Sequence, residues 1–129
     1  MMPRGRRATW SYVALLLAIA LPATAHHSFA MFDREHPIEV RGTVREFQWT
    51  NPHVWIQVLV ADAGGASREW GIECTSVNAL KRQGWTHASL KAGDEVRLSI
   101  FPLRDGSRGG QLHAVLELNG GPAQLPGYR

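Results

Sequence analysis

The sequence has little of what commonly stabilises or anchors a small protein. It contains one cysteine, Cys74, so no disulfide can form within the chain. Its longest apolar run, residues 12–21, is shorter than the roughly 20 residues that a membrane-spanning helix needs. It also lacks a Gly-x-Ser-x-Gly elbow, a His-Glu-x-x-His pair, a phosphate-binding glycine loop and a Cys-x-x-Cys motif. These absences disfavour a disulfide scaffold, a membrane anchor and the common enzyme classes, and we predict a non-enzymatic protein.

The N-terminus has the three parts of a secretory signal peptide. Arg4, Arg6 and Arg7 form a positive region, the apolar run follows, and the Ala-Thr-Ala segment 23–25 supplies small residues before a cleavage site. We expect residues 1–25 to be removed after Ala25, and the mature protein to be periplasmic or secreted without a membrane span. General secretion is the default route, and the adjacent arginines leave the twin-arginine route open.

The charge balance disfavours a nucleic-acid partner. Of the 14 Lys and Arg residues three lie in the signal peptide, which leaves 11 against the 11 Asp and Glu residues. A nucleic-acid-binding surface needs an excess of Lys and Arg to neutralise phosphates. We therefore expect no nucleic acid among the partners of the mature chain.

Patterns of period two predict short strands with one side buried. The first begins at Ile38 and is interrupted by Gly42, which predicts a bend at which one strand serves two sheets. Further strands are expected over 54–60, 68–74, 95–103 and 111–118. A short helix is expected after the third strand, capped by Ser76 and ended by Gly84.

This order of elements is that of the OB fold, in which a helix lies between the third and fourth strands of a five-stranded Greek-key barrel. We therefore predict an all-β protein with one short helix and an OB-like barrel over residues 38–118. An N-terminal arm, 26–37, precedes the barrel, and a flexible tail rich in Gly and Pro, 119–129, follows it. An irregular two-sheet sandwich is the alternative.

Several segments resemble those of a known family. The most specific are Trp49-Thr50-Asn51-Pro52-His53 and Gly84-Trp85-Thr86, and the others are His26-His27-Ser28-Phe29, Asn78-Ala79-Leu80 and Leu90-Lys91-Ala92-Gly93-Asp94-Glu95-Val96. Together they resemble a family of small exported bacterial proteins classed as a domain of unknown function, over nearly the whole mature chain. The resemblance implies a secreted or periplasmic OB-like barrel and no established activity.

The processed N-terminus suits copper. A chain that begins at His26 presents a free amine and an imidazole on one residue, which together chelate Cu(II). A further imidazole from His27, His36 or His53 completes a set of three nitrogens. Cleavage after Ala23 instead places a histidine third, which also binds Cu(II). The alternative is a solvated end that holds no metal in the cell.

A second group of candidate residues surrounds the predicted turn before the second strand. Trp49, Asn51, His53 and Trp55 are expected to line a pocket on the barrel face that OB domains use for ligands. In the alternative, Trp49 fills the core and His53 bonds to the backbone. We expect Glu73, a lone strand carboxylate, to be solvated.

Other residues have structural expectations. Cys74 shares a strand face with Trp70 and Ile72, which predicts a buried, inert thiol, and Trp85 is expected in the core. The sequence therefore predicts an exported binding module for an unidentified small ligand, peptide, glycan or envelope protein. The alternatives are a periplasmic copper-binding protein and a structural accessory of an envelope complex.

Overall fold

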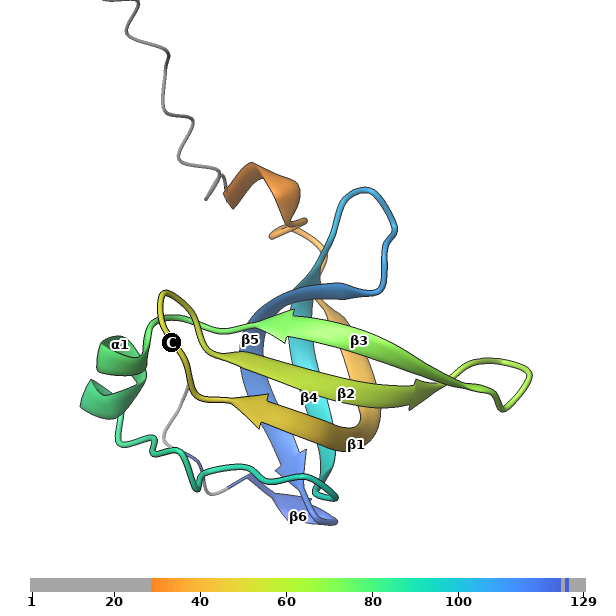
Figure 1. Cartoon of the computed structure of the whole chain (residues 1–129). Helices are drawn as coiled ribbons and strands as arrows, with labels where there is room; N and C mark the ends of the chain where they lie inside the picture. Colours follow the sequence, from red (N-terminus) through yellow and green to blue (C-terminus); the bar gives the residue numbers. More distant parts are fainter. Residues whose placement is uncertain (1–28, 124, 126–129) are drawn as a thin grey trace, which may run out of the picture.

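The computed structural model describes residues 29–123 and 125, which form a small barrel of strands (Figure 1). The helix α1 (Val77–Arg82) lies between the third and fourth strands, and a 3-10 helix, η1 (Phe29–Met31), precedes the first. The strands are β1 (Ile38–Gln48), β2 (Trp55–Ala61), β3 (Ser67–Glu73), β4 (Glu95–Pro102), β5 (Gly109–Leu118) and β6 (Gly121–Pro122).

The strand order identifies the topology. Neighbours follow the order β3-β2-β1-β4-β5-β6, and an additional parallel pairing of β3 with β5 closes the barrel. The other pairings are antiparallel. A closed five-stranded barrel with a helix between β3 and β4 is the OB topology. The predicted all-β, OB-like fold is therefore confirmed, and the two-sheet sandwich is not formed.

Strand β1 changes partners at Gly42, as its sequence predicted. Residues 38–43 pair with β4 and residues 43–48 with β2. At the bend a Cβ atom on Gly42 would lie 2.3 Å from the carbonyl oxygen of Leu59 and 2.8 Å from a methyl group of Val58. A register shift between Val44 and Glu46 adds a bulge just beyond it. Only a residue without a side chain lets β1 approach β2 this closely.

Inward strand positions and the helix form one core. The side chain of Ser76 caps α1 by accepting a hydrogen bond from the N–H of Ala79, at 3.3 Å. Gly84 then turns the chain with a φ of 89°, so that Trp85 enters the core with 1% of its surface exposed. The buried cluster comprises Val40, Val44, Val54, Ile56, Val58, Ile72, Cys74, Val77, Leu80, Trp85, Leu90, Val96, Leu98, Ile100 and Leu112.

The described part of the N-terminal arm is anchored to the barrel. Phe32 is buried and bridges Leu103, and the N–H of Asp33 donates to the carbonyl of Pro102 at 2.8 Å. The N–H of Arg104 donates in turn to the carbonyl of Met31 at 2.9 Å. The arm therefore reaches the barrel beside the loop between β4 and β5.

The segment after β5 also departs from expectation. Gly121–Pro122 forms β6 against Glu117 and Leu118, and Leu125 packs against the core. The tail expected to be flexible from residue 119 thus begins with a paired strand.

The predicted signal peptide, residues 1–25, lies outside the described residues. None of the helices that the structure describes has the length and apolar character that crossing a membrane requires.

Asp94 ties the end of β5 to the start of β4. It is 5% exposed, and its carboxylate accepts hydrogen bonds from the N–H of Lys91 at 2.9 Å and from the amide of Asn119 at 3.0 Å. The Asn119 side chain also accepts from the N–H of Glu95, at 2.9 Å. Burial raises the pKa of Asp94, but the hydrogen bonds from Asn119 and Lys91 outweigh it and hold that pKa below its ordinary value.

The bend in β1 gives the first prediction. We expect Gly42→Ala to lower the free energy of unfolding by about 1–3 kcal/mol, because the added Cβ overlaps the Leu59 carbonyl. Urea unfolding measures the change. Gly64→Ala is the control, since the nearest atom to its added Cβ is a carboxylate oxygen of Asp62 at 3.4 Å, and we expect a change within about 0.5 kcal/mol. An equal loss in both variants would contradict this account of the bend.

Asp94 gives the second prediction. Because its folded-state pKa lies below its unfolded-state pKa, its contribution to stability is present above pH ~4 and is lost as pH falls through the folded-state pKa. We expect Asp94→Asn to cost about 1–3 kcal/mol at neutral pH and to flatten the fall in stability on acidification. Denaturant unfolding at pH 7 and in acid tests this. The exposed neighbour Glu95, changed to Gln, is the control and should retain the wild-type acid dependence.

Candidate functional site

Four tryptophans lie in the described part of the chain, and three of them serve the core. Trp85 is buried, and Trp49 and Trp70 pack against the buried cluster. Trp55 does not pack against that cluster. It precedes the buried Ile56 on β2, so its side chain points to the outside of the barrel, where it is half-buried. Single apolar side chains are normal on protein surfaces, so the groups around Trp55 decide whether this face can hold a ligand.

The indole of Trp55 lies over a position that has no side chain. A Cβ atom on Gly71 of β3 would come within 3.8 Å and 3.9 Å of two Trp55 ring atoms and within 3.4 Å of Oε1 of Gln57. The Gln57 amide donates to Oε1 of Gln48 at 3.4 Å, and the Gln48 amide donates to Glu46 at 3.1 Å. The ring is therefore flanked on β1 and β2 by amides whose orientations are set by their neighbours.

A histidine and a carboxylate lie beside the same ring. Glu73, the register partner of Trp55, is hydrogen-bonded to Nδ1 of His53. The side chains of His53 and Glu73 are 27% and 13% exposed, respectively. The backbone ahead of β2 is fixed as well, since the N–H of Val54 donates to the carbonyl of Thr75 at 3.0 Å. A carboxylate on Nδ1 fixes the orientation of the imidazole.

The structure brings together two of the four residues predicted to line a ligand pocket. His53 and Trp55 share the outward face, whereas Trp49 packs inward with its ring centroid 5.6 Å from that of Phe47. Asn51 is exposed in the loop between β1 and β2. Glu73, which we expected to be solvated, is largely buried and paired. Strand alternation predicts the outward direction of Glu73, which follows the inward Ile72, but not its pairing with His53.

The histidines predicted to bind copper are not assembled in the described structure. His26 and His27 lie outside the described residues, and His53 is engaged with Glu73. His36 is exposed and hydrogen-bonded through Nδ1 to Asp33 at 3.0 Å. Across residues 29–123 and 125, no three His, Cys, Asp or Glu side chains are grouped to hold a metal.

The single thiol is an inert part of the core. Cys74 is 1% exposed, and burial, together with the nearby charge of Glu73, raises the pKa of the thiol. It therefore stays protonated at neutral pH and is a poor nucleophile. The expectation of a buried thiol is confirmed.

A hollow of about 500 Å³ lies elsewhere on the surface, where β1 leaves β2 for β4. Leu59 and Ala61 contribute apolar lining, and Arg41, Arg97 and Glu117 contribute charge. Its size alone would make it the obvious ligand site.

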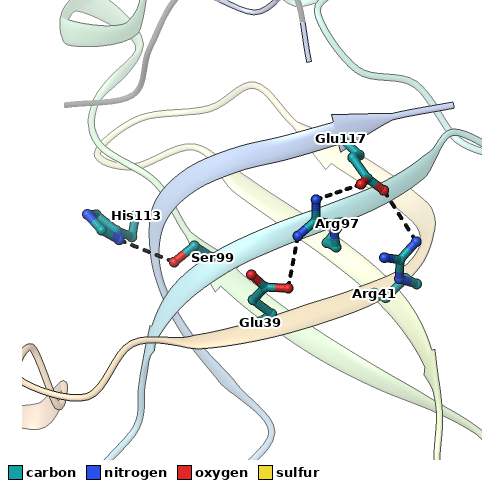
Figure 2. A network of polar contacts seen from close by, with 6 residues as sticks. All are labelled: Glu39, Arg41, Arg97, Ser99, His113 and Glu117. Carbon is teal, nitrogen blue, oxygen red and sulfur yellow. Dashed lines mark hydrogen bonds and ion pairs between the residues drawn. The ribbon is translucent and has the colours of Figure 1, made fainter. Parts of the chain in front are cut away.

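Three charged side chains that line this hollow, Arg41, Arg97 and Glu117, are engaged with one another and with Glu39 (Figure 2). Arg97 donates to Glu117 at 2.6 Å and to Glu39 at 3.0 Å, and Arg41 donates to Glu117 at 3.3 Å. The hydrogen bonds that Arg97 donates to Glu117 and Glu39 raise the pKa of Arg97, and the hydrogen bond from Arg97 lowers the pKa of Glu117. Two arginines and two glutamates balance, so we assign the network to holding β1, β4 and β5 together and place the candidate ligand site at Trp55.

The fold and a match to a family model place the chain as follows. The chain is a small OB-like barrel with an outward aromatic on β2. It belongs to DUF6152, a family of unknown function, whose model matches residues 14–113. The family membership expected from the sequence is therefore confirmed.

The solved structures that are similar include the mitochondrial single-stranded DNA binding protein Rim1 from S. cerevisiae. The TM-score is 0.41 and the sequence identity 13%, over 64% of this chain and 93% of that one. No curated protein matches the sequence.

Proposed function

We propose that the protein is an exported, non-enzymatic binding module whose ligand contacts the outward face of β2 and β3. One observation carries this proposal: Trp55, unlike the other described tryptophans, lies outside the core and spreads over Gly71. Polar groups flank it on both sides, Gln57 and Gln48 on one and the His53–Glu73 pair on the other. A flat apolar surface with a few oriented polar groups is typical of ligand sites. OB domains also bind ligands on the face of these strands.

The chemistry of this face disfavours a thiol enzyme and offers oriented hydrogen-bonding groups. The Cys74 thiol behind it is buried and protonated, so it cannot serve as a nucleophile. The carboxylate of Glu73 is hydrogen-bonded to His53, which orients both groups. These two groups are therefore suited to hydrogen bonding with a ligand.

Trp55 gives the third prediction. Wild-type protein is titrated calorimetrically with panels of soluble oligosaccharides and short peptides. For a compound that binds, we expect Trp55→Ala to weaken the Kd at least about tenfold, because the variant loses the aromatic surface under the ligand. Leu59→Ala removes another outward side chain of β2 and should leave the Kd unchanged.

The thermal midpoints of both variants establish that they are folded. Equal weakening by the two substitutions, or unchanged affinity in Trp55→Ala, would place the ligand elsewhere and refute the proposed site.

Metal binding by the arm is a second candidate function, and the contact between Asp33 and His36 favours it. The carboxylate of Asp33 holds Nδ1 of His36 at 3.0 Å, and the imidazole is 78% exposed. A carboxylate that orients an imidazole in this way is common behind metal-bound histidines. The arm is anchored to the barrel through Phe32. His36 lies on this arm, and the same segment of the sequence carries the predicted ligands His26 and His27.

Copper gives the fourth prediction. We expect processed protein that begins at His26 to bind Cu(II) in a calorimetric titration, and an added N-terminal methionine to abolish tight binding because it removes the amine from the chelate. His36→Ala should weaken binding. His53→Ala is the matched control, because His53 lies just before β2 and not on the arm, and should not weaken it. Equal affinity with and without the added methionine would refute the terminal site.

A further inference from the structure

Trp55 belongs to a row of outward side chains that crosses four strands. Gln48 of β1 is in register with Trp55 of β2, Trp55 with Glu73 of β3, and Glu73 with Gln111 of β5. Residues in register on paired strands share a face, so all four side chains point outward. We call these four residues the polar row. Figure 1 shows β1, β2 and β3 side by side on one face, and β5 begins beside β3.

The N-terminal arm extends the polar row at its β5 end. Arg34 donates a hydrogen bond to Oε1 of Gln111, and its guanidinium lies 5.4 Å from the centroid of the Phe101 ring. Because Oε1 is the acceptor, the amide nitrogen of Gln111 keeps its donors for other partners. The arm thus holds the Gln111 side chain in place, with its amide N–H groups able to donate to a ligand on the row.

The dimensions of the row call for an extended ligand. Neighbouring strands lie about 4.8 Å apart, so the three spacings from Gln48 to Gln111 span roughly 14 Å. Along this path the protein offers an amide, an aromatic ring, a carboxylate paired with His53 and a second amide. Beside the row Gly71 and Gly109 carry no side chains, and the backbones approach so closely that a Cβ on Gly109 would lie 2.6 Å from the Gly71 carbonyl oxygen. No side chain at these two positions therefore stands between a ligand and the row.

We propose that the polar row binds an extended oligosaccharide that runs across the strands from Gln48 to Gln111. This proposal rests on the proposed binding function and names its ligand class. Sugar hydroxyls donate and accept hydrogen bonds, as the amides and the carboxylate require, and the C–H groups on a sugar face pack against the negative face of an aromatic ring such as Trp55.

Strand pairing argues against a peptide. A peptide that adds to a sheet needs a strand with an unpaired edge. Along the row β2 is paired with β1 and β3, β3 with β2 and β5, and the start of β5 with β3 and β4, whereas β1 beyond Thr43 is paired with β2 alone. Main-chain groups of β2, β3 and β5 are therefore engaged with one another, and recognition across these three strands falls to side chains.

Chain-length dependence tests the proposal and is the fifth prediction. The probes are cello-, chito- and malto-oligosaccharides from disaccharide to hexasaccharide, titrated calorimetrically into wild-type protein and variants. For the series that binds, we expect affinity to rise with length. Gln111→Ala should weaken hexasaccharide binding about threefold to tenfold, the worth of one hydrogen bond, and leave the disaccharide unchanged. Arg34→Ala, an exposed substitution, should show the same pattern.

Controls separate this proposal from the one on which it rests. Asn78→Ala removes an exposed amide on α1 and should bind every length as wild type does. Equal affinity for all lengths, or equal weakening of short and long sugars by Gln111→Ala, would refute binding along the polar row but would leave the proposed site at Trp55 intact. Failure of every series, with a short peptide binding in a Trp55-dependent manner, would overturn the ligand class alone. Sugar binding with the same affinity in wild type and Trp55→Ala would refute both the Trp55 site and the polar row.

Discussion

The barrel depends on the close approach of β5 to β3 and to β4, and glycines permit that approach. A Cβ on Gly109 would lie 2.6 Å from the carbonyl oxygen of Gly71 on β3, and a Cβ on Gly110 would lie 2.3 Å from that of Phe101 on β4. A side chain at Gly109 would push β5 away from β3 and open the parallel pairing that closes the barrel. Gly71, the β3 partner of Gly109, also gives Trp55 a surface to lie over, and the same pairing brings Glu73 into register with Gln111. Closure of the fold and formation of the candidate site therefore share one cause.

Local patterns were enough to predict the order of elements and hence the fold. Gly42 interrupts a strand of period two, and the interruption is the bend at which β1 changes partners. Ser76 and Gly84 bracket the helix because capping and positive φ are local requirements. The parallel pairing of β3 with β5 followed only from the fold class, since no local feature of residues 109–111 identifies a partner some 40 residues earlier. The anchoring of Phe32 is equally non-local, because one aromatic in a polar segment has no periodicity.

The candidate site was predictable in part for the same reason. The alternation of side chains along a strand predicts that Trp55 points to the other face of β2 from Ile56, which is outward. Trp49 precedes a turn, where alternation predicts no direction for the side chain. The pair of His53 and Glu73 is produced by the register of β2 with β3, which sequence alone left unspecified. The contribution of Arg34 required knowledge that the arm folds back to β5. The sequence therefore pointed to Trp55 and His53 but not to the residues that strand pairing brings beside them, Glu73 and Gln111.

The outer surface of the barrel is thus divided between two uses of polar side chains. Where β1 has left β2, Arg97 is held by Glu39 and Glu117, and these charges are matched to one another across three strands. A ligand there would have to compete with ion pairs that help to hold the strands in place. Around Trp55, the strands are held by backbone pairing and by the packing of Ile56 and its neighbours beneath them. Side chains on that face are therefore not required for closure, which leaves them available for the ligand proposed above.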